Sequence, residues 1–324
     1  MRRKGLIEKN MRGRFAPSPS GHLHLGNAYT ALLSWLQVRA AGGQFLLRVE
    51  DLDWARCRGE YLDSLLRDLE YLGLYWDEEP IFQSRRQVAY QETLSALERR
   101  GLAYPCFCSR SEISRAASAP HGAADDGPRY PGTCSALSAE QVRERALKRM
   151  PATRFRADPG STEFVDEVQG RRVEDVHTRV GDFVICRNDR VASYQLAVVI
   201  DDAFSRISHV LRGADLLSST ARQIQLYRAL GLSPPRFAHV GLVVSPEGAR
   251  LAKRQGAFSV SQLRSLGVEA PRIVGLLGKW AGIHDGRPTS AADLISSFAL
   301  HRLPRELVRT SEEQVCVHLD LTPM

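Results

Sequence analysis

The first hundred residues alternate between strand-like and helix-like patterns of apolar positions. Residues 44–49 are apolar almost throughout, as expected of a parallel strand covered on both faces, and residues 12–16 form a shorter strand before them. Apolar residues recur at helical spacing over residues 27–41, 59–73 and 83–100. Strands that alternate with amphipathic helices predict an α/β fold with a mostly parallel sheet.

The pattern changes near residue 105. The chain becomes rich in Ala, Gly, Ser and Pro, with a loop predicted over residues 114–127, and a charged helix is predicted at residues 139–148. We expect residues 105–190 to form an insertion with a small β-rich core of its own. Its strand-like segments are residues 153–156, 162–165 and 182–186.

The α/β pattern resumes after residue 190. Residues 191–200 are largely apolar and end at two aspartates. A helix is predicted at residues 218–230, and Ser218 or Ser219 could cap it. A polar loop at residues 245–257 precedes a mostly helical remainder. The strands on either side of the predicted helix are residues 207–211 and 238–244.

Composition narrows the class of protein. A hydrophobic content of 43% and a charged content of 25% are ordinary for a globular protein, and no apolar run is long enough to span a membrane. The basic N-terminus lacks the apolar stretch of a signal peptide. Six cysteines in 324 residues are too few for a disulfide framework, so we expect reduced thiols and a cytoplasmic protein. The net charge of +7 is compatible with a polyanionic partner such as RNA.

A turn within residues 14–27 has the features of a nucleotide site. Pro17 and Pro19 fix the backbone in an extended turn, and Gly21 and Gly26 allow a ligand to approach closely. The helix that follows offers unpaired N–H groups and a partial positive charge to phosphate. The same pattern also fits an ordinary surface turn, and its two histidines could instead form a zinc pair.

Two further features carry charges suited to such a site. Glu50, Asp51 and Asp53 follow the strand at residues 44–49, where open α/β sheets bind their ligands. Lys253 lies in a predicted loop from which it could reach phosphates and neutralise charge in phosphoryl or adenylyl transfer. A loop lysine alone is more often a solvated surface charge, so its meaning depends on the turn.

Together these blocks resemble the class I glutamyl-tRNA synthetases. Residues 14–27 are similar to the HIGH region of that family, and residues 251–255 to its KMSKS loop. Residues 47–53 and 210–216 match further blocks in the same order, and the resemblance covers about residues 12–260.

The chain after Gln255 is too short for the large helical anticodon-binding region of full glutamyl-tRNA synthetases. That length resembles the glutamyl-queuosine tRNA(Asp) synthetases, which are stand-alone catalytic domains, and residues 194–202 are also similar to theirs. The resemblance implies an enzyme that activates L-glutamate with ATP, without tRNA. It then attaches the glutamyl group to queuosine in the anticodon of tRNA(Asp).

The resemblance also implies a domain organisation. A Rossmann-type parallel sheet is expected in two halves, residues 1–104 and 191–262, split by a zinc-binding, acceptor-like insertion at residues 105–190. A short helical region without an anticodon-binding domain, residues 263–324, follows. We expect a monomer that binds the anticodon stem-loop of tRNA(Asp) and no membrane.

Roles for individual residues follow from the same resemblance. Arg14 would pair a carboxylate of glutamate and Glu50 would hold its ammonium group. A second arginine, Arg212, suits a substrate with two carboxylates. The residues expected to contact glutamate are Arg14, Phe15, Ala16, Pro17, Ser18, Glu50, Tyr194 and Arg212.

For ATP, His24 and Lys253 are the expected catalytic residues. His24 and the helix start would hold the phosphates, and Lys253 would stabilise the transition state at the α-phosphate, with Mg²⁺ on the pyrophosphate. The loop departs from the family pattern, because it has one lysine and Ala252 replaces the usual serine. The full expected ATP set is His22, His24, Gly26, Asn27 and Lys253.

Three cysteines predict a structural zinc site in the insertion. Cys106, Cys108 and Cys134 supply thiolates, although buried reduced thiols without a metal are the simpler alternative. The family resemblance implies Tyr130 as the fourth ligand. His121, in the loop between, is chemically the better ligand and is kept as the rival.

Two other functions remain open. The chain could be an enzyme of the same class with another acceptor, such as the 3′ end of a tRNA(Glu). It could also be a non-catalytic paralogue that binds RNA or nucleotide.

Overall fold

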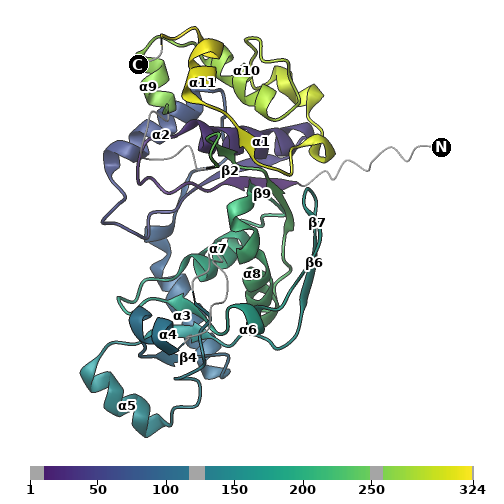
Figure 1. The fold of residues 1–324 in the computed structure, drawn as a ribbon. Coiled ribbons are helices and arrows are strands. Elements are labelled where there is room, and N and C mark those ends of the chain that lie inside the picture. The colour runs from purple at the N-terminus through teal and green to yellow at the C-terminus, as the bar shows by residue number, and fades with distance from the viewer. Residues whose placement is uncertain (1–10, 117–127, 249–257, 323–324) are drawn as a thin grey trace, which may run out of the picture.

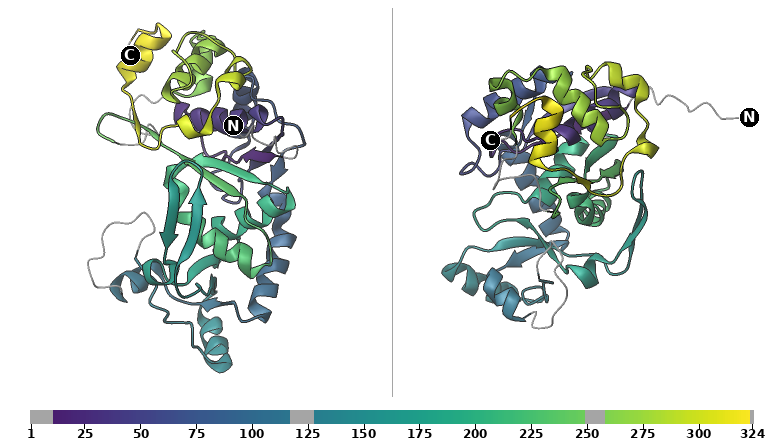
Figure 2. Two further views of the ribbon diagram at one scale, coloured as in Figure 1. Left: turned by 90° about the vertical axis from the view of Figure 1, so that its right-hand side faces the viewer. Right: turned by 45° about the horizontal axis from the view of Figure 1, so that its top comes forward.

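The computed structural model describes residues 11–116, 128–248 and 258–322. The molecule is elongated (Figure 1): the first strands and helices pack with the C-terminal helices at one end, and α4 and α5 lie at the other. Two further views show the same order along the long axis (Figure 2).

The first sheet is parallel, as predicted, with the order β1-β2-β3. The helix α1 (Leu25–Ala40) joins β1 to β2 and is buried along most of its length. The predicted helix at residues 83–100 begins with a 3₁₀ turn, η1 (Gln83–Arg86), and continues as α3 (Gln87–Arg99). The remaining elements of this half are β1 (Arg12–Phe15), β2 (Gln44–Val49), β3 (Ile81–Phe82) and α2 (Gly59–Tyr71).

The second half lies directly against the first. The parallel strands β9 (His209–Gly213) and β10 (Arg236–Val240) are joined by α8 (Leu217–Ala229). The backbone N–H of Ser208 donates to the carbonyl of Arg12 in β1 over 2.9 Å, which brings β9 beside β1 although the two residues are 196 positions apart. Two segments that are far apart in the sequence therefore lie side by side in the fold.

Most of the apolar segment at residues 191–200 lies in a helix, α7 (Tyr194–Phe204). It packs against α3 and α8, and Asp201 and Asp202 near its end are fully buried. The predicted caps of α8 are wrong. A 3₁₀ turn, η2 (Ala214–Leu216), leads directly into α8, so Ser218 and Ser219 lie within its first turn and Leu216 is the cap residue without a side-chain bond.

The insertion does not have a separate β core. Three of its strands form an antiparallel sheet, but the hairpin β6–β7 extends the second half, because β6 pairs in parallel with β10. Phe155 and Ile185 share one core with Leu196 of α7 and Tyr227 of α8. The elements of the insertion are β4 (Ala103–Cys106), α4 (Arg110–Ala116), α5 (Ala139–Lys148), β5 (Ala152–Phe155), β6 (Thr162–Asp166), β7 (Gly170–Glu174), α6 (Val176–Arg179) and β8 (Phe183–Cys186).

The C-terminal region is helical, as predicted, but it also contains a strand. β12 (Val308–Arg309) pairs in parallel with β11 (Val243–Val244). The predicted strand at residues 238–244 is interrupted at Gly241, where a Cβ would lie 1.7 Å from the carbonyl oxygen of Glu306. The other elements are α9 (Val260–Ser265), α10 (Ala270–Trp280), η3 (Asp293–Ser297), η4 (Leu300–Arg302) and α11 (Glu312–Leu319).

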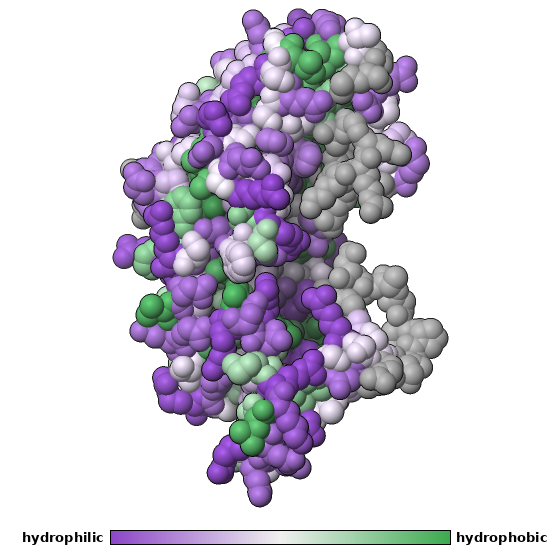
Figure 3. Space-filling model, turned by 90° about the vertical axis from the view of Figure 1, so that its left-hand side faces the viewer, coloured by the Kyte–Doolittle hydropathy of each residue, from purple (hydrophilic) through white to green (hydrophobic). Residues whose placement is uncertain are grey.

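The surface around α5 is mainly hydrophilic (Figure 3), and α5 itself has no buried residue. Within the described ranges, no helix combines the length and the apolar character needed to cross a bilayer.

Candidate active site

A cavity of about 500 Å³ lies at the carboxyl ends of β1, β2 and β9. Every residue expected to contact glutamate lines it, and so do His22, His24, Gly26 and Asn27. Lys253 lies outside the described residues. The structure thus brings together the described part of the predicted site, from segments about 200 positions apart in the sequence.

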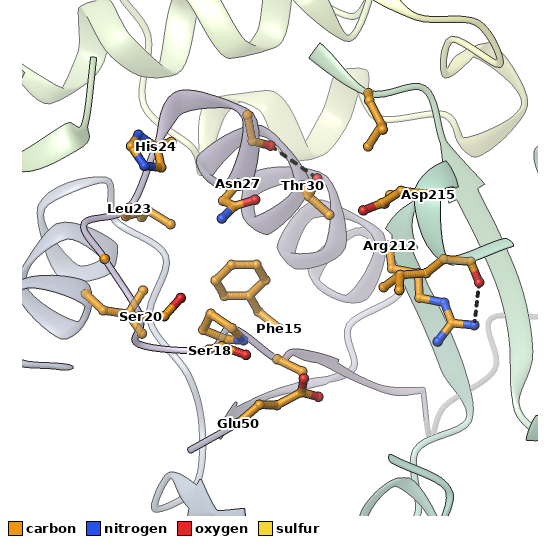
Figure 4. Close-up of a pocket in the computed structure, with 18 of the residues that line it drawn as sticks. Phe15, Ser18, Ser20, Leu23, His24, Asn27, Thr30, Glu50, Arg212 and Asp215 are labelled. Atoms are coloured by element: carbon orange, nitrogen blue, oxygen red, sulfur yellow. Dashed lines mark hydrogen bonds between the residues drawn. The ribbon is translucent and has the colours of Figure 1, made fainter. Parts of the chain in front are cut away.

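The cavity has two ends (Figure 4). Glu50 lies at one end beside the turn after β1, and His24 and Asn27 lie at the other, at the start of α1. Arg212 and Asp215 enter from the β9 side. The backbone N–H of Glu50 donates to the carbonyl of Pro17 over 2.9 Å, which fixes the acid beside the proline turn.

The segment after residue 257 is attached to the same turn. The N–H of Val260 donates to the carbonyl of Leu23 over 2.8 Å, and the N–H of Leu25 donates to the carbonyl of Phe258 over 3.3 Å. His24 and Ser259 form an antiparallel bridge. The described end of the loop that carries Lys253 is therefore anchored at the first turn of α1.

Four charged side chains form a buried cluster at the end of the cavity where Glu50 lies. Arg14 Nε donates to Asp202 Oδ1 over 3.1 Å, and Arg48 donates to Glu50 over 2.9 Å and to Asp202. Burial raises the pKa of Glu50, and Arg48 offsets only part of that effect. Burial acts the same way on Asp202, but Arg14 and Arg48 outweigh it and lower the pKa of Asp202 below its ordinary value.

We expect Asp202→Asn to lower the free energy of unfolding by about 3 kcal/mol, because it leaves two buried arginines short of a counter-charge. The folded pKa of Asp202 lies below its unfolded value. Its contribution to stability is therefore complete above that unfolded value, about 3.9, and is lost as the pH falls through the folded pKa. Denaturant unfolding at a series of acidic pH values should show this dependence in the wild type and a weaker one in the variant. Equal stability at neutral pH would contradict the expectation.

Arg212 has a different environment from Arg14. It is buried, and its guanidinium donates to His239 Nε2 over 2.9 Å, to Thr220 Oγ1 over 3.0 Å and to Tyr194 Oη over 3.4 Å. These acceptors are neutral oxygens or a ring nitrogen. Burial lowers the pKa of Arg212.

Sequence reasoning missed several residues of the site. Arg48 and Asp202 complete the charge cluster, and Asp215 and Thr30 line the cavity. Arg48 gave one usable signal, since a charged residue within an otherwise apolar strand needs a buried partner. Asp202 and Asp215 lie in segments that resemble the family, but nothing in those segments indicates which side chains they contact.

The three predicted thiols lie together in the insertion. The sulfurs of Cys106, Cys108 and Cys134 are all within 4.8 Å of one another, and Cys108 Sγ lies 3.6 Å from Cys134 Sγ. Thiolates on a tetrahedral zinc ion, with Zn–S bonds of about 2.3 Å, are separated by about 3.8 Å. The cluster therefore has a geometry that fits a metal ion.

Tyr130 is placed to complete that cluster. Its Oη lies 3.4 Å from Cys106 Sγ and 4.0 Å from Cys108 Sγ, and it accepts the backbone N–H of Cys134 over 2.9 Å. Burial and the neighbouring thiol raise the pKa of Tyr130, an effect that a bound cation would reverse. His121 lies outside the described residues.

Residues 10–284 match the family model of the catalytic domain of class I tRNA synthetases (E and Q). The chain belongs to this family and is a ligase of the aminoacyl-tRNA synthetase type. Over almost its whole length it is similar to proteins named glutamyl-Q tRNA(Asp) synthetase, which confirms the resemblance seen in the sequence. The Symbiobacterium thermophilum protein is 47% identical over 94% of this chain and 97% of its own length. The Nitratidesulfovibrio vulgaris protein is 43% identical, over 93% and 96% respectively.

Solved structures agree with the fold. The crystal structure of a glutamate tRNA ligase from Elizabethkingia meningosepticum, in complex with its amino acid, superposes with a TM-score of 0.81 at 27% identity. The superposition covers 95% of this chain and 68% of that one. The class I synthetase fold with a parallel sheet is thus confirmed.

Proposed function

We propose that this protein activates L-glutamate with ATP, without tRNA, and transfers the glutamyl group to queuosine in the anticodon of tRNA(Asp). The observation that carries the amino-acid part is the cavity, whose lining includes Glu50 and two buried arginines, Arg14 and Arg212. One acid and two bases complement the one ammonium group and two carboxylates of glutamate. The acceptor rests on the relatives, whose name specifies glutamyl-Q tRNA(Asp) and whose lengths this chain nearly matches.

In the first step, an α-carboxylate oxygen of glutamate attacks the α-phosphorus of ATP, and the bond to the bridging oxygen breaks to release pyrophosphate. Arg14, whose Nε is held by Asp202, presents its terminal nitrogens to a carboxylate, and Glu50 holds the ammonium group. His24 and the first turn of α1 bind the phosphates at the other end of the cavity. Lys253 stabilises the charge that develops at the α-phosphate. Mg²⁺ would neutralise the phosphate oxygens as they leave.

In the second step, a hydroxyl of queuosine attacks the carbonyl carbon of glutamyl-adenylate, and AMP leaves with the bonding electrons. The RNA would meet basic residues of the insertion, and binding is then strongly salt-dependent. Exposed cations at the end of the molecule that carries α5 include Arg143, Arg145, Lys148 and Arg149.

The acceptor assay tests this proposal most directly. The wild type should glutamylate queuosine-containing tRNA(Asp) and leave the unmodified form uncharged. Equal charging of both forms would overturn the acceptor. Pyrophosphate exchange with glutamate and no tRNA tests the first step. Exchange no higher than in a Lys253→Ala control would favour a non-catalytic paralogue.

Glutamate binding should weaken at acidic pH. Glu50 must be ionised to hold the ammonium group, and its pKa is raised by burial, so the KM for glutamate should rise as the pH falls toward that raised value. Glu50→Gln should show a high KM at every pH, whereas the exposed Glu79→Gln should behave like the wild type. Pyrophosphate exchange across a pH series measures both. A Glu50→Gln variant with the wild-type profile would contradict the role.

We also propose that the thiol cluster binds one structural zinc ion, with Tyr130 as the fourth ligand. The distances from Tyr130 Oη to the cysteine sulfurs support this set. Metal analysis of the purified variants decides whether Tyr130 or His121 is the fourth ligand. Tyr130→Phe should lower the zinc content, and His121→Ala should leave it at one ion per chain. The reverse result would assign the ligand to His121.

A further inference from the structure

Two residues behind the cavity hold Arg212 in place. His239 on β10 and Asp166 at the end of β6 have fully buried side chains, with His239 Nδ1 2.5 Å from Asp166 Oδ2. His239 Nε2 lies 2.9 Å from Arg212 Nε. Neither Asp166 nor His239 lines the cavity, so both act on a ligand only through Arg212.

The hydrogen bonds define the protonation of this chain of residues. A guanidinium only donates, so His239 Nε2 must accept from Arg212. His239 is therefore neutral, carries its proton on Nδ1 and donates it to Asp166. Asp166 stays in place because it also accepts the backbone N–H groups of Val168, Gln169 and His239 over 3.0, 2.7 and 3.1 Å. Burial lowers the pKa of His239 to about 4, which agrees with a neutral ring.

This arrangement leaves Arg212 without a carboxylate in direct contact, since Asp166 reaches it only through the neutral His239 ring. The hydrogen-bond acceptors of Arg212 are the His239 ring, the hydroxyls of Thr220 and Tyr194 and the carbonyl of Leu216, all of them neutral. No carboxylate among the described residues forms an ion pair with Arg212. Arg14 and Arg48, in contrast, are balanced by Asp202 and an ionised Glu50.

Among the arginines that line the cavity, Arg14 contacts a carboxylate of the protein, whereas Arg212 contacts only neutral acceptors. Glutamate brings one net negative charge and glutamine brings none. A buried charge without a partner is costly, so a ligand that supplies the missing carboxylate is favoured over its uncharged amide. A carboxylate in place of His239 would remove that preference.

We infer that Asp166 and His239 are positioning residues that make the cavity select glutamate over glutamine, by orienting Arg212 with a neutral acceptor and leaving its charge for the substrate. This inference rests on the proposed function, since it assumes an amino-acid substrate in this cavity. To that function it adds two residues that do not contact the substrate, Asp166 and His239, and a physical reason why glutamate is selected over glutamine.

The test is pyrophosphate exchange with glutamate and with glutamine, in the full chain. His239→Leu removes the acceptor, and we expect the ratio of kcat/KM for glutamate to that for glutamine to fall by about tenfold or more, with the KM for ATP unchanged. His239→Gln restores a neutral acceptor and should return the ratio to within about threefold of wild type. His209→Leu, at a buried histidine near the start of β9, is the matched control and should leave the ratio unchanged.

A folded His239→Leu variant with the wild-type ratio would overturn the inference, and so would a His239→Gln variant as impaired as His239→Leu. If neither variant folds, nitrogen NMR of wild-type protein labelled at histidine can measure the protonation state and tautomer of His239. A neutral His239 with its proton on Nδ1 supports the inference, and a charged ring or a proton on Nε2 overturns it. A wild type without glutamate-dependent exchange would instead reject the proposed function.

Discussion

Arg212→Met is expected to reduce kcat/KM for glutamate in pyrophosphate exchange by about 10³-fold. The substitution removes a buried guanidinium that has no carboxylate of the protein in direct contact, and pairing such a group with a substrate carboxylate in a buried site is worth several kcal/mol. Methionine fills much of the same volume, so the loss reports on the charge rather than on packing. The KM for ATP should change little, because the residues proposed to bind the phosphates, among them His24 and Asn27, lie at the start of α1.

Arg287→Met is the matched control for this experiment, since Arg287 is a highly exposed arginine in the C-terminal region. It should retain wild-type exchange. If Arg212→Met lost less than about tenfold, the residue would not be a main contact for a substrate carboxylate.

Removal of the proposed zinc ion is expected to unfold the tip of the insertion. The core there consists of six buried residues, which is too small to fold stably without an additional constraint. After treatment with a chelator, amide hydrogens in β4 and in residues 128–137 should lose their protection from exchange. The buried residues of this core are Tyr104, Cys106, Phe107, Ile113, Tyr130 and Cys134.

The rest of the protein should be less affected. The cavity proposed to bind glutamate belongs to a different core, so glutamate activation should persist after the proposed zinc ion is removed, whereas transfer to RNA should fall. Cys134→Ser should reproduce the effect of the chelator, and Cys57→Ser, outside the cluster, should not. A purified protein that holds no metal yet protects β4 from exchange would contradict the zinc proposal.

The sequence predicted the fold correctly in segments where the apolar residues follow one clear pattern. β2 and α5 have the predicted bounds, because a continuous apolar run and a capped, charged helix are each unambiguous locally. α7 was not assigned, since a helix buried on several sides has no polar face to reveal its period. β12 was missed because it has two residues and is stabilised only by β11.

The sequence motifs predicted the residues that line the site, but not the residues that hold those side chains in position. The turn after β1 and residues such as Glu50 and Arg212 carry a family pattern that can be read from one sequence. Asp202 contacts Arg14 across 188 positions, and His239 contacts Asp166 across 73. Such pairs leave no local signal, because nothing in either segment reveals its partner.

Because β1 lies beside β9, which is synthesised much later, the fold also has a consequence for synthesis of the protein. β1 leaves the ribosome long before Ser208, whose backbone N–H meets the carbonyl of Arg12. The intervening 196 residues take roughly 10–40 s to translate at 5–20 residues per second. During that interval the growing chain exposes an unpaired strand edge, which is a suitable target for a chaperone. Rapid translation of the insertion should therefore favour the yield of native protein.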